Sequence, residues 1–311
     1  HNLSANDRMF GRFSVFRFDN LRDSVFEQPA RGGQNNDRAF DDNDSRSVAF
    51  SHTRILTPRL LHEFRYGFNR QKVDKREITK LLLSDLTAKY GIRGLPGNDR
   101  LFGLPEFNLG GAIGYQGLGE PGSMPNFKIS QVHQYLDNLA WNRGNHNFKF
   151  GTDLRWNRSD IFGGSSSHGS FTFDGQFTRV SFGDFLLGYP ATASFTSLLI
   201  GNMRFRNYMF YAQDDWKLTP RLTLNLGLRY ELTSPWFEKY DNMNQLGLDP
   251  GSNFNRIVRA GDCGRSWSCR GLVSTDTNNW APRLGLAWRW RNRTVVRSGF
   301  GTFYGGQGAL G

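Results

Sequence analysis

The feature that most constrains this chain is a two-residue alternation of apolar and polar side chains, which recurs in many segments. In the clearest run, Leu222 to Glu231, four leucines and a tyrosine alternate with Thr, Asn, Gly, Arg and Glu. Successive side chains of a β-strand point to opposite faces of the sheet, so this pattern predicts strands with one apolar and one polar face. The chain is therefore expected to be all-β and antiparallel.

Runs of this kind predict eleven strands, which are joined by connections of two very different lengths. Residues 57–60 and 219–222 have the same sequence, Thr-Pro-Arg-Leu, and proline suits a tight turn because its φ is fixed and it donates no ladder hydrogen bond. Long loops are expected at about 19–45, 73–129 and 235–279. The predicted strands are 8–18, 46–57, 59–71, 130–142, 147–158, 168–177, 191–201, 205–218, 222–234, 280–290 and 294–304.

The lengths of these strands and loops distinguish between two kinds of all-β protein. A soluble sandwich or propeller has strands of about five to six residues, with turns every 8–12 residues or so. Several strands here reach the roughly 9–11 residues that a tilted strand needs to cross a bilayer. Long extracellular loops, short periplasmic turns and aromatic residues near strand ends are typical of outer-membrane barrels. The sequence therefore predicts an antiparallel transmembrane β-barrel, present as a partial barrel of about eleven strands.

The composition excludes a transmembrane helix and favours some classes of binding partner over others. The mean hydropathy is −0.56 and no apolar run reaches 18 residues, so no transmembrane helix is expected. The formal net charge of +11 favours anionic partners, such as lipopolysaccharide in the outer membrane or a nucleic acid. Because the basic residues are scattered and accompany no nucleic-acid motif, we expect lipid and lipopolysaccharide contacts and no nucleic-acid binding.

Residues 207–231 closely resemble a barrel hairpin of TonB-dependent outer-membrane receptors. The match is carried by Gln-Asp-Asp-Trp at 213–216, Leu-Thr-Leu-Asn at 222–225 and Gly-Leu-Arg-Tyr-Glu at 227–231. Segments 144–151, 184–188, 281–285 and 295–304 are similar to the Oar-like branch of that family, whose members carry a carboxypeptidase-regulatory-like domain. The resemblance covers most of residues 8–304.

The resemblance implies that residues 1–311 form part of a receptor barrel that imports an unidentified ligand through the TonB complex, without a cofactor and without enzymatic activity. Family barrels have 22 strands around a plug, and a plug domain and a TonB box are both missing from these residues. We therefore expect that residues 1–311 alone cannot transport, and are insoluble or pair their edge strands with another copy. Two alternatives stay open: a passive porin or adhesin-type barrel, and an outer-membrane barrel hydrolase.

Six charged residues occupy the polar phase of the strand patterns and are expected to face the lumen. They either contact a ligand or plug, or pair with one another in a water-filled interior; we favour pairing, since a charge costs little where it faces water. They are Arg65, Asp153, Arg155, Arg229, Glu231 and Arg283. The acidic run at 41–44 lacks the glycine and distal glutamate of an EF-hand and is expected to be a solvated loop.

Two cysteines, Cys263 and Cys269, lie in the long loop at 235–279. Because the extracellular side and the periplasm are oxidising, we predict a disulfide between them, with two free thiols as the alternative. Closing so short a loop stabilises the fold by about 2 kcal/mol in the chain-entropy model. Helical patterns are also expected within loops, at 77–90 and near 182–188.

Overall fold

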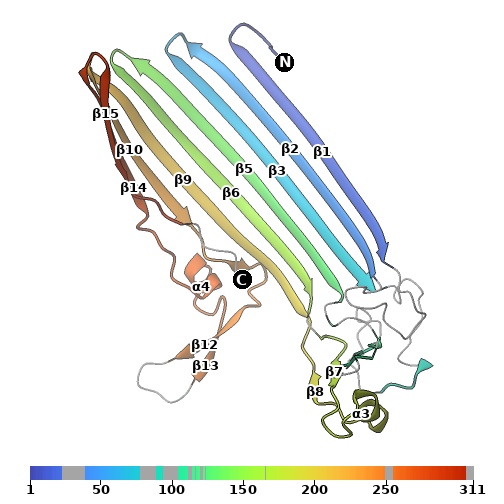
Figure 1. The fold of residues 1–311 in the computed structure, drawn as a ribbon. Coiled ribbons are helices and arrows are strands. Elements are labelled where there is room, and N and C mark those ends of the chain that lie inside the picture. The colour runs from blue at the N-terminus through green and yellow to red at the C-terminus, as the bar shows by residue number, and fades with distance from the viewer. Residues whose placement is uncertain are drawn as a thin grey trace.

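The computed structural model describes residues 1–22, 39–77, 89–93, 104–110, 114–115, 117–119, 122, 124–164, 166–248 and 255–305. A single ten-stranded sheet of long antiparallel strands dominates it (Figure 1). The strands follow one another along the chain in the order β1-β2-β3-β5-β6-β9-β10-β14-β15, and the short β11 also pairs with β9. Their bounds are β1 Asp7–Arg22, β2 Ala39–Thr57, β3 Leu60–Glu77, β5 Asn126–Arg143, β6 His146–Gly163, β9 Leu199–Thr219, β10 Leu222–Thr233, β11 Phe237–Glu238, β14 Trp280–Arg291 and β15 Thr294–Gly301.

Tight two-residue turns join neighbouring strands at one end of the sheet. They lie between β2 and β3, β5 and β6, β9 and β10, and β14 and β15. In the two Thr-Pro-Arg-Leu turns the threonine hydroxyl accepts the amide of the arginine, at 3.3 Å for Thr57 and at 3.2 Å for Thr219. The repeated sequence therefore produces the same local structure twice.

Long connections lie at the opposite end of the sheet, as expected, and they hold the remaining short elements (Figure 1). They join β1 to β2, β3 to β5, β6 to β9 and β10 to β14. The connection between β6 and β9 was expected to contain two wall strands, whereas it is a fourth long loop. The other elements are β4 Glu106–Leu109, β7 Ser170–Phe173, α3 Ser181–Leu187, β8 Thr192–Ser194, β12 Asn244–Leu248, β13 Asn255–Arg259 and α4 Trp267–Gly271.

The two predicted strands at 168–177 and 191–201 do not form wall strands. The middle of the first forms β7 and the beginning of the second forms β8, and both join β4 in a separate three-stranded sheet, while residues 199–201 begin β9. The alternating aromatic residues pack against rings of neighbouring elements: Phe171 stacks on Phe107 at 5.6 Å, and Phe173 meets Phe185 of α3 edge-on at 5.3 Å, between ring centroids. Alternation in this loop therefore builds a small aromatic core instead of a lipid-facing surface.

Several strands extend further than predicted. β1 continues to Arg22 and β2 begins at Ala39, so residues 41–44 lie inside a strand and not in a solvated loop. The helix expected at 182–188 is present as α3, which ends at Gly188 with φ 72°. Residues 78–88, which contain most of the other expected helix, lie outside the described residues. Among the described residues, no helix has the length and apolar content needed to cross a membrane.

The sheet is open and exposes much of its apolar surface. β1 and β15 are its edges, and within the described residues they do not pair with each other. Phe13 on β1, Leu284 on β14 and Phe300 on β15 are 66%, 55% and 70% exposed. Most of the buried hydrophobic side chains lie instead among the loops, including Leu104, Leu109, Met124, Phe173, Phe237, Ala260 and Cys269. The prediction of an all-β partial barrel is confirmed.

Candidate functional site on the polar face of the sheet

The strand register places all six predicted lumen residues on one face of the sheet. Directly paired residues of antiparallel strands share a face, and one row of such pairs crosses five strands. That row contains Arg65, Asp153 and Glu231, and it runs through Leu136 and Met209. Arg155 and Arg229 lie in the two adjacent rows of the same face, and Arg283 lies one row beyond Arg229. The face prediction from alternation and the observed register thus agree for all six.

Most of these charged residues form ion pairs along their own strands. Arg155 donates to both carboxylate oxygens of Asp153, at 3.0 and 2.7 Å, and the amide of Gln134 donates to the same oxygens. Arg229 Nε donates to Glu231 Oε1 at 2.5 Å. The structure therefore brings together two ion pairs from the predicted set, Asp153 with Arg155 and Arg229 with Glu231.

Arg65 has a partner that was not among the predicted residues. Its Nη2 donates to Glu63 Oε1 at 2.6 Å, and the Asn138 amide approaches the other Glu63 oxygen at 3.5 Å. The Tyr211 hydroxyl then donates to Asn138 Oδ1 at 2.8 Å. A polar network therefore runs from β3 through β5 to β9 across the face.

A shallow groove of about 260 Å³ lies on this face where Gly227 leaves the backbone uncovered. Lys149, Arg229 and Arg283 approach it from three strands, together with the ring of Tyr211. Lys149 is held by Asp215 at 3.3 Å and Arg229 by Glu231. The groove is therefore lined by three cations, and two of them are already neutralised by neighbouring carboxylates.

Arg283 differs from the other two cations of the groove. Its guanidinium carbon lies 4.9 Å from the ring centroid of Phe303, and no carboxylate among the described residues lies within 4.0 Å of it. A guanidinium over an aromatic face keeps its charge and most of its hydrogen-bond donors. Arg283 is therefore the cation of this groove that is most available to an anionic group.

Glycines keep this face open. A Cβ added at Gly151 would lie 2.4 Å from Cε1 of Tyr211 and 2.5 Å from Oδ1 of Asn138, so a side chain there would displace the tyrosine–asparagine hydrogen bond. At Gly67, on the same face, the nearest atom to such a Cβ is 3.9 Å away. Gly151 is thus required for the network, whereas Gly67 is not.

Sequence reasoning missed several members of this site. Glu63, Gln134 and Asn138 accept or donate across strands, and Lys149 and Asp215 flank the groove. Lys149 is in the same alternation phase as Asp153 and Arg155, so its position was accessible from the strand pattern. The cross-strand partners required the register, which alternation within a single strand does not supply.

The described side chains of this face are mainly ion pairs and hydrogen-bonding amides, which can recognise a charged group. Among the described residues, no group of three or more His, Cys, Asp or Glu side chains is placed to hold a metal. The described hydrogen bonds of the ring nitrogens of four histidines go to carboxylates, Tyr66 and Gln131, and none of them goes to a serine hydroxyl; these are His52, His62, His133 and His146. These contacts therefore provide no support for the hydrolase alternative.

The cysteine pair lies in the loop between β10 and β14. Cys263 and Cys269 are joined by a disulfide with their Cα atoms 5.6 Å apart, and Cys269 belongs to α4 and is buried. The hydroxyl of Ser266 accepts the Cys269 amide at the start of that helix. Arg270 Nε donates to Asp241 at 2.6 Å and Arg270 Nη2 donates to two backbone carbonyls, so the disulfide segment is fastened to the chain that follows β11.

Comparisons with known proteins agree with this architecture. A family model described as "Outer membrane beta barrel domain" matches residues 1–310. No curated protein matches the chain. The outer membrane transporter YddB from Escherichia coli is 13% identical with a TM-score of 0.48, and the match covers 98% of this chain and 30% of that one. The copper transporter OprC is 11% identical with a TM-score of 0.34, and the match covers 95% of this chain and 40% of that one. The chain spans less than half the length of either structure.

Proposed function

Because the chain belongs to the outer membrane beta barrel domain family, we propose that it forms part of the wall of a TonB-dependent transporter that imports an unidentified ligand. The protein is located in the outer membrane. The observation that carries the proposal is the two-faced sheet: charged residues pair with one another on one face, while leucine and aromatic residues cover the part of the other face nearer the tight turns. A wall of this kind separates an aqueous lumen from lipid.

The hairpin of β9 and β10 supports the TonB-dependent assignment. Residues 207–231, which resemble the receptor family, form that hairpin, and their polar phase supplies Arg229 and Glu231. Residues 184–188, which resemble the Oar-like branch, form the end of α3, where Asp184 is fully buried and receives the Phe177 and Thr178 amides and the Thr178 hydroxyl. The motifs that carry the resemblance thus form a hairpin of the sheet and the buried end of a loop helix in this chain.

In the proposed transporter the cationic groove binds an anionic group of the ligand or of the plug. Arg283 provides the charge that no described carboxylate neutralises, and Lys149 and Arg229 add to the positive potential. The plug and the segment that engages TonB belong, in this proposal, to parts of the protein outside residues 1–311. No nucleic acid, cofactor or catalytic step is involved in it.

Ion conductance and TonB binding of the full-length protein test the proposal. A plugged receptor in a planar bilayer with KCl is closed and opens when urea loosens the plug, and it binds the purified periplasmic domain of TonB. A barrel that conducts KCl constitutively and does not bind TonB is a passive porin, and that result would refute the proposal. Hydrolysis of an ester or peptide substrate that is abolished by a single serine or histidine substitution would select the hydrolase.

A further inference from the structure

The four tight turns form a rim at one end of the sheet, and this rim carries cations without carboxylates. Within three residues of the turns at 58–59, 144–145, 220–221 and 292–293, the sequence contains no aspartate and no glutamate. At least one arginine lies beside every turn, and the basic residues there are all exposed. We call them the rim cations: Arg59, Arg143, Lys217, Arg221, Arg289, Arg291 and Arg293.

The rim cations have no carboxylate partners in the part of the chain that the structure describes. None of the ion pairs at this end of the sheet includes one of them. Two aspartates lie close to the rim on the outer face, which is the face opposite the candidate site, and a histidine holds each of them. His62 Nε2 is 3.0 Å from Asp137 Oδ2, and His146 Nδ1 is 2.6 Å from Asp214 Oδ2. The positive charge of the rim is therefore not neutralised from within the sheet.

The backbone ladder brings rim cations of adjacent strands together. The amide of Arg289 donates to the carbonyl of Arg221 at 2.7 Å, so these two arginines are neighbours across β10 and β14. The amide of Asn142 donates to the carbonyl of Arg59 at 2.8 Å, which places the β2–β3 turn beside Arg143. Like charges on neighbouring strands destabilise a sheet. An anion bound at the rim relieves this repulsion.

Two of the rim cations lie over tryptophan rings at the edge of the apolar surface. The guanidinium carbon of Arg143 is 5.4 Å from the ring centroid of Trp141, and that of Arg291 is 4.7 Å from the ring centroid of Trp290. Trp288 lies 6.5 Å from Trp290, between ring centroids, and both are exposed. A guanidinium over an aromatic ring keeps most of its hydrogen-bond donors. Arg143 and Arg291 therefore present N–H groups beside exposed aromatic surface.

The strand geometry gives the height of the rim in the membrane. Aromatic residues form belts at the two interfaces of an outer-membrane barrel, and its short turns face the periplasm. Arg143 follows Trp141 by two residues, or about 5 Å along the membrane normal for about 3.4 Å per residue and a tilt near 40°. The rim cations therefore lie in the layer of the head groups of the periplasmic leaflet.

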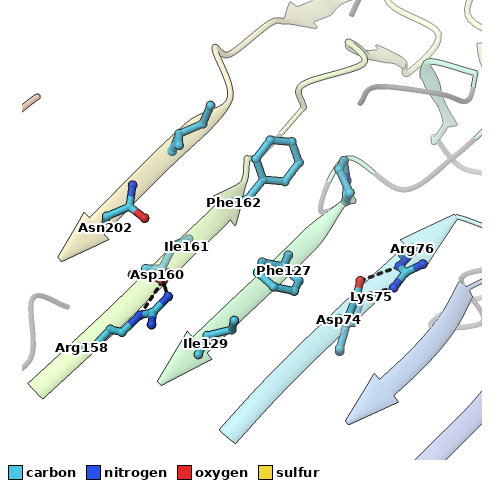
Figure 2. Close-up of a pocket in the computed structure, with 12 residues that line it drawn as sticks. Asp74, Lys75, Arg76, Phe127, Ile129, Arg158, Asp160, Ile161, Phe162 and Asn202 are labelled. Atoms are coloured by element: carbon cyan, nitrogen blue, oxygen red, sulfur yellow. Dashed lines mark hydrogen bonds and ion pairs between the residues drawn. The ribbon is translucent and has the colours of Figure 1, made fainter. Parts of the chain in front are cut away.

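The opposite end of the outer face, near the long loops, differs from the rim because its arginines have carboxylate partners. Figure 2 shows a groove of about 470 Å³ there, with Arg76 beside Asp74 and Arg158 beside Asp160, and both contacts are ion pairs. An arginine that already binds a carboxylate gains less from a lipid phosphate than one without such a partner. The rim cations are therefore the stronger attraction for an anionic lipid.

We propose that the rim binds phospholipids of the periplasmic leaflet whose head groups have a net negative charge. Arg143 and Arg291 each bind a lipid phosphate, which a planar guanidinium holds by two parallel hydrogen bonds. The acyl chains lie against Trp141 and Trp290. A zwitterionic lipid also carries an ammonium group, for which the rim provides no carboxylate, so net negative lipids are preferred. This binding involves neither TonB nor the imported ligand and is tested separately from the proposed function.

The test uses the full-length protein in detergent micelles, with fluorescently labelled phosphatidylglycerol as the probe. We expect Arg143→Gln/Arg291→Gln to weaken binding about ten-fold or more, because each cation near a membrane surface contributes roughly five-fold to the affinity for anionic lipid. The matched control is Arg17→Gln/Arg70→Gln, which removes the same charge from the opposite end of the outer face. It lies beyond a Debye length of about 10 Å from the rim, so the affinity should change less than about two-fold. Heat-modifiable gel mobility verifies that each variant is folded.

Three results would overturn the proposal. One is equal displacement of the probe by unlabelled phosphatidylglycerol and by phosphatidylethanolamine, because the rim then does not select lipids by their net charge. Another is the same loss of affinity in the rim variant and in the control, which indicates a general effect of protein charge. The third is a rim variant that binds the probe normally but no longer binds the purified periplasmic domain of TonB, because the rim then serves a protein partner. Displacement by phosphatidylglycerol alone, with affinity lost only in the rim variant, supports the proposal.

Discussion

An arginine on the lipid-facing side of β10 should destabilise the barrel, and Leu228 is the position where this is clearest. Leu228 follows Leu222, at the tight turn, by six residues, which places it about 15 Å along the membrane normal and close to the middle of an apolar band about 25 Å tall. Its register partners are Ala212 and Pro282, so a guanidinium there meets no carboxylate directly across the strands. At Leu226, by contrast, Asp214 lies opposite.

Arginine at the midplane of a lipid-facing surface costs about 2–4 kcal/mol. At about 1.4 kcal/mol per factor of ten, Leu228→Arg should lower the folding equilibrium constant roughly 30- to 700-fold. The assay is urea titration of the full-length protein in liposomes, with tryptophan fluorescence and heat-modifiable mobility as readouts. The midpoint of unfolding should fall accordingly.

Gln213→Arg is the matched control for Leu228→Arg. Gln213 follows Ala212, so it lies at the same height and points to the polar face, where its amide donates to Asp215 at 3.1 Å. An arginine there faces water and retains a carboxylate partner, so we expect a change below about 1 kcal/mol. Equal destabilisation by both substitutions, or by neither, would refute the assignment of the two faces.

Three further predictions concern single features of the structure. Replacing Cys263 and Cys269 by serine should lower stability by about 2 kcal/mol, and thiol labelling of the unsubstituted protein should succeed only after reduction. Gly151→Val should cost about 1–3 kcal/mol by overpacking, whereas Gly67→Val, with open space on the same face, should cost less in the same urea titration. At Asp184, burial raises the pKa, but hydrogen bonds from the Thr178 hydroxyl and nearby amides outweigh burial and lower the pKa below its ordinary value. The ionised Asp184 carboxylate therefore stabilises the fold above about pH 4, and this stabilisation is lost as the pH falls through the lowered pKa. Hydrogen exchange of the amides bound to Asp184 should accelerate in that acidic range and should lose this pH dependence in Asp184→Asn.

The two faces of the sheet were predictable from the sequence because the alternation within each strand shows which of its residues share a face. Alternation around Asp153 and Arg229 depends only on the two-residue period of a strand. In the register all six predicted residues share a face, and that this face lines a lumen stays a prediction. Their partners were not predictable in the same way. Glu63 and Asn138 meet only because β3, β5 and β9 are aligned across the sheet, and a one-residue shift would reverse every contact.

The wrong predictions for residues 168–177 and 41–44 have a common physical cause. Alternation shows that the two faces of a strand differ in polarity, but it does not show what each face contacts. Phe171 and Phe173 alternate because their rings pack against β4 and α3, and a lipid-facing strand produces the same pattern. At residues 41–44 both faces of β2 are polar, since Asp42 and Asp44 pair with Lys72 and Arg46 on the outer face. With no apolar phase, the extension of the strand above the membrane resembles a loop.

The parallel pairing of β4 with β7 joins two loops that are distant in the sequence. Glu106 to Leu109 pair with Ser170 to Phe173, and the Ser170 hydroxyl donates to Glu106 at 2.6 Å. An insertion or deletion that shifts either loop by one residue therefore breaks hydrogen bonds and ring contacts in both. Over evolutionary time these two loops should change length together, and exchange of either loop between related proteins should succeed only when its partner is exchanged as well.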